Sequence, residues 1–236
     1  MTDPLILIPG LMSDARLFAA QITDLSRGRP VTIALPLHGN TIEDISAAIL
    51  ATAPPRFAVA GLGLGAHIAL DLMRRDLTRI TKVAFLSADP LGETPDAAAA
   101  REKRMILART GRLFQAMQDE LPARALADTD TRETLMDLVA DMAQTLGADV
   151  FIAQSRALQR RRDQQKTLRR ATMPALILAG AKDTLVTPRR QAFMADLMPT
   201  ARVQIIENAG HLLPLEQPAA VTKALMNFFQ GPLILR

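Results

Sequence analysis

Six short apolar segments alternate with helical patterns along most of the chain, and this alternation restricts the fold more than any other feature. The segments are mostly apolar and do not alternate between apolar and polar residues, although they include Thr32, Lys82 and Gln204. Such runs are typical of parallel strands that are buried on both faces. The segments are 5–8, 31–35, 57–60, 82–86, 175–179 and 203–206. Helical patterns follow three of them, at 66–75, 190–197 and 218–229. This order predicts an α/β fold with a mostly parallel, doubly wound sheet.

The length of 236 residues is typical of one α/β domain, so we expect a single domain over 1–236. One connection is out of proportion. The stretch 88–174 is far longer than the roughly 10–12 residues that a crossover needs, and its pattern is helical. We expect it to be a helical lid insertion above the carboxyl edge of the sheet, where open α/β sheets place their ligands.

The composition excludes several classes of protein. Apolar residues make up 49% and charged residues 22%, which is typical of a globular chain. No apolar run approaches the roughly 18 residues of a membrane span, and the amino terminus lacks a basic secretion signal, so we expect a cytoplasmic protein without a membrane partner. The absence of cysteine excludes disulfides, thiol nucleophiles and cysteine metal sites. With three histidines and no ligand spacing, we expect no metal and no cofactor.

The positive charge of the chain is local. The net charge is +4, but the segment 156–170 contains seven basic residues and one acid, so the remainder is slightly acidic. No aromatic residues are interleaved there to stack on bases. A single basic helix is more often a solvated surface than a nucleic-acid site, and we expect no nucleic-acid partner.

The most informative segment is the glycine-rich turn after the third apolar segment, FAVAGLGLGAHIALDLMRR at 57–75. One interpretation is dinucleotide binding, because G-L-G-L-G-A fits G-x-G-x-x-A and Asp89 supplies an acid after the next strand. The turn is on the third strand, however, and Asp89 lies farther from Gly61 than the usual ~20 residues. A dinucleotide-binding oxidoreductase therefore stands as the third alternative.

The second interpretation of this turn is a nucleophile elbow, G-x-S-x-G, with Gly61 and Gly65 as its glycines and Gly63 at the nucleophile position. Two loops favour it. LAGAKDTLVTP places Asp183 after the fifth apolar segment, and IENAGHLLPLEQP places His211 after the sixth. Because the carboxyl ends of parallel strands share one edge, both side chains can converge on Gly63.

The loop after the first strand, LIPGLMSDARLF, completes this interpretation. We expect the backbone N–H groups of Leu11 and Leu64 to form an oxyanion hole.

With these four pieces the chain resembles the α/β-hydrolase superfamily, in the branch of small lid-bearing esterases and 3-oxoadipate enol-lactonases. The resemblance covers nearly the whole chain and is carried most specifically by GAKDTLVTP and NAGHLLPLEQP. It implies hydrolysis of a carboxylic ester or lactone, with Asp183 orienting His211. The extra antiparallel strands with which this fold normally begins are absent from the sequence.

Gly63 departs from the family pattern, because the family has its serine nucleophile there and glycine has no side chain that can form an acyl-enzyme. Three hypotheses remain open. The His211–Asp183 pair acts as a general base, the chain is a serine-to-glycine variant of an active esterase or lactonase, or the protein binds a ligand or partner without catalysis. Glycine also relieves the strain of an elbow, which costs a side chain about 1–3 kcal/mol.

The expected pocket is apolar. Met12, Leu62 and Leu212 are the predicted substrate-binding residues, with further leucine and methionine from the lid, and such a lining suits an apolar acyl group. The expected ligand is a small ester- or lactone-like molecule. Whether the basic segment 156–170 reaches the pocket and favours an anionic substrate stays open. Ser13, Ser87 and His67 are interpreted as turn, capping or packing residues.

Overall fold

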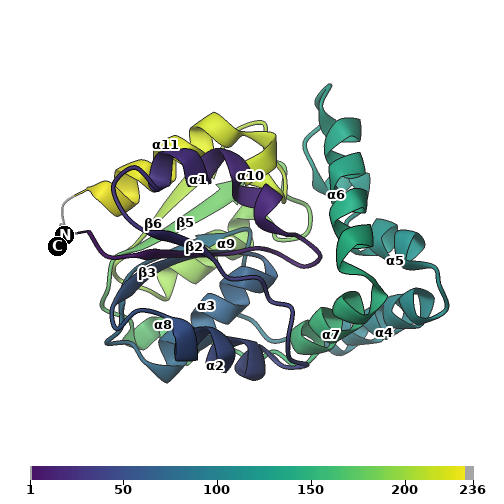
Figure 1. Cartoon of the computed structure of the whole chain (residues 1–236), viewed down its shortest axis with the longest axis horizontal. Coiled ribbons are helices and arrows are strands. Elements are labelled where there is room, and N and C mark those ends of the chain that lie inside the picture. The colour runs from purple at the N-terminus through teal and green to yellow at the C-terminus, as the bar shows by residue number, and fades with distance from the viewer. Residues whose placement is uncertain (1, 232–236) are drawn as a thin grey trace.

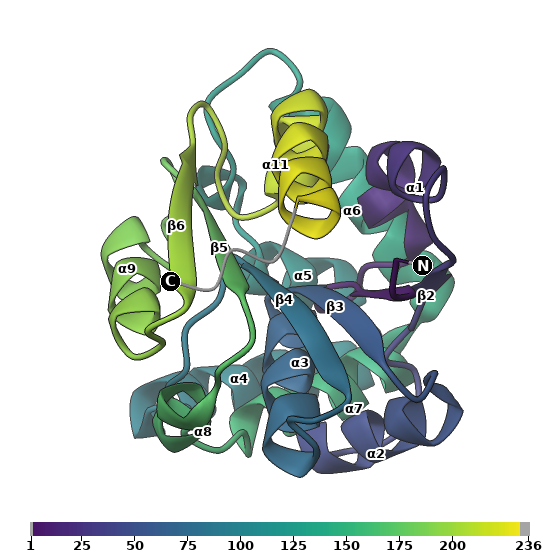
Figure 2. The same cartoon turned by 90° about the vertical axis from the view of Figure 1, so that its left-hand side faces the viewer.

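The computed structural model describes residues 2–231 and contains one six-stranded sheet (Figures 1 and 2). The strands run in the order β2-β1-β3-β4-β5-β6, and all neighbouring pairs are parallel. Their bounds are β1 (Leu5–Ile8), β2 (Val31–Ile33), β3 (Phe57–Leu62), β4 (Ile80–Leu86), β5 (Ala175–Gly180) and β6 (Ala201–Ile206). The predicted parallel α/β sheet is confirmed.

The two outermost strands differ from the expectation. β2 ends at Ile33 instead of 35, and neither β2 nor β6 is buried on both faces, because each has a neighbour on one side only. β6 presents Val203 and Ile205 at 39% and 41% exposure. The four central strands are buried almost throughout.

Helices cover both faces of the sheet (Figure 1). One face is packed by α1 (Ala19–Leu25), α10 (Leu213–Glu216) and α11 (Pro218–Gln230), with the short η1 (Ala15–Phe18) beside them. The other face carries α2 (Ile42–Thr52), α3 (Leu64–Arg75), α8 (Gln165–Arg170) and α9 (Pro188–Asp196). Two apolar cores therefore enclose the sheet, and the carboxyl ends of its strands are left for other elements to cover.

Helices from the long connection between β4 and β5 occupy that edge, at the right of Figure 1. They are α4 (Pro95–Arg109), α5 (Leu113–Glu120), η2 (Ala123–Ala125), α6 (Arg132–Leu146) and α7 (Ala148–Gln159). α4 packs against α5 and α7, and α6 packs against the same two helices. The first of these helices starts where the sequence favours it, because the Thr94 hydroxyl accepts a hydrogen bond from the Ala97 amide and Pro95 follows the cap.

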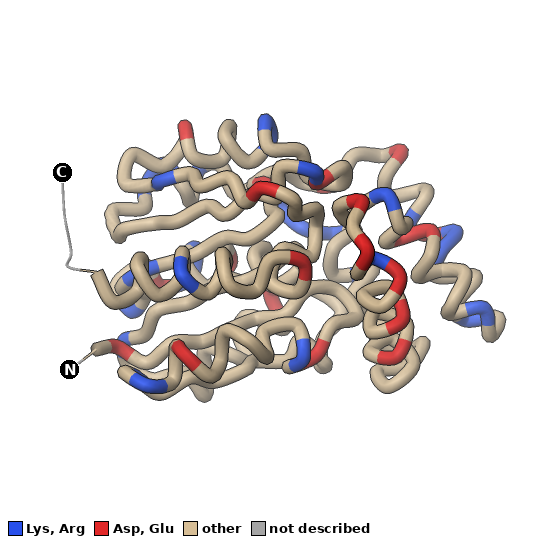
Figure 3. Tube along the Cα trace, turned by 90° about the horizontal axis from the view of Figure 1, so that it is seen from above, with Lys and Arg blue, Asp and Glu red and all other residues tan. Residues whose placement is uncertain are grey.

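The basic segment 156–170 is not a single helix, and that expectation was wrong. α7 ends at Gln159, a turn follows, and α8 then packs against α3 on the face of the sheet. The turn forms because Arg161 bends inward and donates to the Leu91 carbonyl, 3.0 Å from Nε. Basic and acidic residues are interspersed over the whole trace (Figure 3). Within residues 2–231, none of the helices combines the length and the apolar character that crossing a membrane requires.

Candidate active site

The turn from β3 into α3 has the shape of a nucleophile elbow. Gly63 has φ +51° and ψ −110°, and its amide donates to the Leu86 carbonyl at 3.0 Å. A Cβ on Gly61 would lie 2.3 Å from the Gly65 carbonyl, and a Cβ on Gly65 would lie 2.0 Å from the Ile8 oxygen. Close packing of backbone on backbone thus accounts for both glycines without a bound dinucleotide.

Asp183 and His211 meet at the carboxyl edge of the sheet. The Asp183 Oδ2 atom is 3.0 Å from the His211 Nδ1 atom, and its Oδ1 atom accepts the amides of Leu185 at 2.9 Å and Val186 at 3.0 Å. Burial by itself raises the pKa of Asp183, but the His211 ring and the Val186 amide outweigh it and hold this pKa below its usual value. Asp183 is therefore an ionised, fixed acceptor for the imidazole.

The other side of the His211 ring faces Gly63. A Cβ built on Gly63 would lie 3.5 Å from the His211 Nε2 atom and would clash with nothing nearer. The imidazole nitrogen that Asp183 does not hold thus points at the predicted nucleophile position. A hydroxyl or a water at this point is within hydrogen-bonding reach of a base.

Leu11 and Leu64 both line the cavity beside Gly63, and the oxyanion hole formed by their amides stays a prediction. Met12 does not line it, and its assignment as a substrate-binding residue was wrong. Its backbone takes φ +51°, its side chain is fully buried in the core, and its amide donates to the Gln154 side chain at 2.8 Å. Gln154 also donates to the Pro36 carbonyl at 3.0 Å, so α7 braces the turn that carries Leu11.

A half-buried carboxylate fixes the loop of His211. Glu216 accepts the amides on both sides of the histidine, from Gly210 at 2.8 Å and Leu212 at 2.9 Å, and a third from Ala127 at 2.7 Å. Burial raises the pKa of Glu216, although the three amides counteract it. The loop that presents His211 is therefore tied to the segment between α5 and α6.

Replacing Glu216 with alanine is expected to lower the free energy of unfolding by about 3 kcal/mol, because three buried amides lose a charged acceptor. Urea unfolding followed by circular dichroism measures it. Glu207→Ala, which removes the same charge from an exposed position in the same loop, is the control and should stay within about 0.5 kcal/mol of the original protein. Equal stability of the two variants would contradict the role of Glu216.

A cavity of about 350 Å³ lies between this site and the helices α4–α7. Gly63, His211, Leu62 and Leu212 line it, so these four predicted residues come together. The segment 113–121, α6 and α7 contribute apolar side chains to it: Met117, Leu121, Val139 and Leu158. α5 also contributes the charged residues Asp119 and Glu120.

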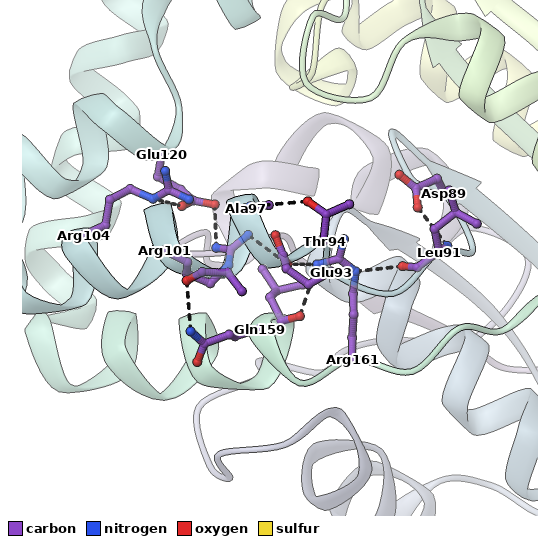
Figure 4. Close-up of polar contacts among 12 residues, drawn as sticks. Asp89, Leu91, Glu93, Thr94, Ala97, Arg101, Arg104, Glu120, Gln159 and Arg161 are labelled. Atoms are coloured by element: carbon purple, nitrogen blue, oxygen red, sulfur yellow. Dashed lines mark hydrogen bonds and ion pairs between the residues drawn. The ribbon is translucent and has the colours of Figure 1, made fainter.

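One wall of the cavity is charged, and there the expectation of an apolar pocket was wrong (Figure 4). Arg101 lies between Glu93 and Glu120, 2.9 Å from the Glu120 carboxylate, and Arg161 is paired with Glu93. Arg104 approaches the Glu120 carboxylate at 2.7 Å. We call Glu93, Arg101, Arg104, Glu120 and Arg161 the polar wall. Of the basic segment 156–170, Arg161 reaches the cavity, whereas Arg162 pairs with Glu43 outside it.

Three residues interpreted as structural in fact border the cavity: Ser13, Ser87 and His67. The Ser13 hydroxyl donates to the Leu11 carbonyl at 3.4 Å, so it serves the turn. Ser87 is fully buried directly after β4, with φ +48°, and its hydroxyl makes no hydrogen bond to the described residues 2–231. Neither serine occupies the elbow.

Comparison with known proteins finds esterases and an enol-lactonase among the proteins that this chain resembles. A pimeloyl-[acyl-carrier protein] methyl ester esterase of Aromatoleum aromaticum is 27% identical over 91% of this chain and 93% of its own. An uncharacterized carboxylesterase of Bacillus subtilis is 36% identical over 27% of this chain, and the match spans 22% of that protein. The solved enol-lactonase of Burkholderia xenovorans superposes with a TM-score of 0.86 at 21% identity, over 98% of this chain and 92% of its own.

The family model described as the alpha/beta hydrolase family matches residues 5–224. This range includes the elbow, both loops of the Asp183–His211 pair and the helices α4–α7 between them. The chain therefore belongs to the alpha/beta hydrolase family.

Proposed function

We propose that the protein hydrolyses a carboxylic ester or lactone, with water activated by His211 in place of an acyl-enzyme. The observation that carries the proposal is the position of the His211 Nε2 atom, 3.5 Å from where a side chain on Gly63 would begin. A water in the space that glycine leaves open lies next to a base whose other nitrogen is held by Asp183.

In this mechanism the water oxygen attacks the acyl carbon while its proton passes to the His211 Nε2 atom. The carbonyl oxygen becomes an oxyanion, which the amides of Leu11 and Leu64 stabilise. The ionised Asp183 stabilises the imidazolium. When the tetrahedral intermediate collapses, the bond to the leaving oxygen breaks, and His211 returns the proton to the alkoxide. The helices α4–α7 act as a lid that excludes other water.

The names of the relatives support ester or lactone chemistry, since they are two esterases and an enol-lactonase. The second candidate is a non-catalytic binding protein on the same fold. Gly63 favours this candidate because glycine has no side chain that can act as the family's nucleophile. The first candidate predicts turnover of an ester or lactone and the second predicts binding alone, but both use the same cavity.

The test measures hydrolysis of p-nitrophenyl esters and of γ- and δ-lactones by the purified protein and by His211→Ala. We expect turnover above the buffer rate, and a roughly 10²–10⁴-fold loss in the variant, because the general base is removed. His38→Ala, which changes an exposed histidine outside the cavity, should leave the rate unchanged. An equal rate in His211→Ala would overturn the proposal, and ligand binding without turnover would favour the binding protein.

A further inference from the structure

His67 is a polar residue in the cavity that the proposed reaction does not use. It follows Gly63 by four residues on α3, so it lies one helical turn from the elbow on the same side of the helix. It is 9% exposed and lines the cavity. Within residues 2–231 its ring makes no hydrogen bond. A ring that borders the cavity and makes no hydrogen bond to this described part of the protein is available to bond to a ligand there.

Three arginines lie close enough to this ring to affect its pKa. Burial is the main cause that lowers the pKa of His67 well below its usual value, and the charges of Arg161, Arg101 and Arg190 lower it further. His67 is therefore neutral at physiological pH and offers one N–H donor. The three guanidinium groups all border the same cavity.

The nearby carboxylates are already engaged. Asp89 accepts the Leu91 amide at 2.9 Å with one oxygen and pairs with Arg190 at 3.1 Å through the other. Glu93 is paired with both Arg101 and Arg161. Each guanidinium carries five N–H groups, and these pairs use only some of them. The charges of this part of the cavity are balanced, and its guanidinium groups and the His67 ring keep N–H donors that these pairs do not use.

We propose that His67, Arg161 and Arg190 bind a carboxylate of the ligand, so that the substrate is an ester or lactone carrying a second, free carboxylate. A group with four acceptor sites matches spare N–H donors better than an apolar acyl chain does. The substrate would lie with its scissile carbonyl at Gly63 and its carboxylate against the start of α9, where Arg190 lies. The inference that the bound ligand is a substrate rests on the proposed function. The binding of a carboxylate at this site does not depend on turnover.

Calorimetric binding of monomethyl glutarate and dimethyl glutarate tests the site, because the two probes differ only in the free carboxylate. We expect the half ester to bind at least 10-fold more tightly to the original protein. Arg190→Gln should reduce this preference to about 2-fold or less. Arg189→Gln removes the same charge from the neighbouring exposed residue, which does not border the cavity, and should keep the preference.

His67→Leu separates recognition from folding. Leucine fills the buried position without a polar group, so the melting temperature should stay level or rise while the preference for the half ester falls. Equal binding of the two probes, or no binding of either, would overturn the carboxylate site, as would equal losses in Arg189→Gln and Arg190→Gln. Preferential binding without ester turnover would support the site and count against the proposed hydrolysis.

Discussion

Replacing Gly63 with serine is expected to raise kcat/KM for ester hydrolysis by roughly 10³-fold or more, because it supplies the nucleophile that the surrounding groups are placed to assist. The added Cβ would lie 3.5 Å from the His211 Nε2 atom, in ordinary contact, so the hydroxyl is within hydrogen-bonding reach of the base. The backbone at position 63 already has the φ +51° of an elbow. The substitution therefore needs no rearrangement around it.

Gly63→Ala is the matched control. It introduces the same Cβ and the same positive-φ strain, about 1–3 kcal/mol, without a hydroxyl. Both variants should therefore lose similar stability, and only the serine variant should gain activity and react with a fluorophosphonate probe. Adding His211→Ala to the serine variant should remove most of the gain, because the hydroxyl then has no base.

A different outcome would be informative. If Gly63→Ser folds with the stability of Gly63→Ala but shows neither turnover nor labelling, the amides of Leu11 and Leu64 and the imidazole of His211 are not in productive positions. The catalytic interpretation of this edge would then be wrong, and the cavity would be a binding site.

The sheet was predictable because the central strands are mostly apolar runs that are buried on both faces, and β1 agrees with its prediction at both ends. The outer strands were harder. β2 and β6 pair on one side, so their exposed positions accept residues of any polarity and the apolar run no longer marks the ends. The mistaken single helix over 156–170 has a related cause, since the contact of Arg161 with Leu91 is made across 70 residues.

Asp183 and His211 were found because each directly follows a strand, and parallel strands bring their carboxyl ends together. Glu216 falls within the motif that carries His211, but nothing local indicates that its carboxylate turns back to three amides. Gln154 and Met12 are 142 residues apart, so their hydrogen bond has no sequence signal. Local patterns reveal where a chain places chemistry, whereas the residues that brace it depend on tertiary packing.

Replacing Gly65 with alanine is expected to lower the free energy of unfolding by about 3 kcal/mol or more. The sign is opposite to helix propensity, which favours alanine over glycine in a helix such as α3 by roughly 0.5–1 kcal/mol. A Cβ at Gly65 would lie 2.0 Å from the Ile8 oxygen and 2.7 Å from the Pro9 oxygen. Because both atoms belong to the backbone, no side-chain rotation relieves the clash, and α3 must move away from β1.

Gly28→Ala provides the control, because its added Cβ would come no closer than 3.8 Å to the Gln230 side chain and its stability should change by less than about 0.5 kcal/mol. The chain has no tryptophan or tyrosine, so urea unfolding must be followed by far-ultraviolet circular dichroism. If Gly65→Ala were as stable as Gly28→Ala, the contact between α3 and the end of β1 would be looser than 2.0 Å implies. The φ of Gly63 would then depend on the local turn alone. The packing of β1 against α3 would not be what fixes the positions of Leu11 and Leu64 beside the cavity.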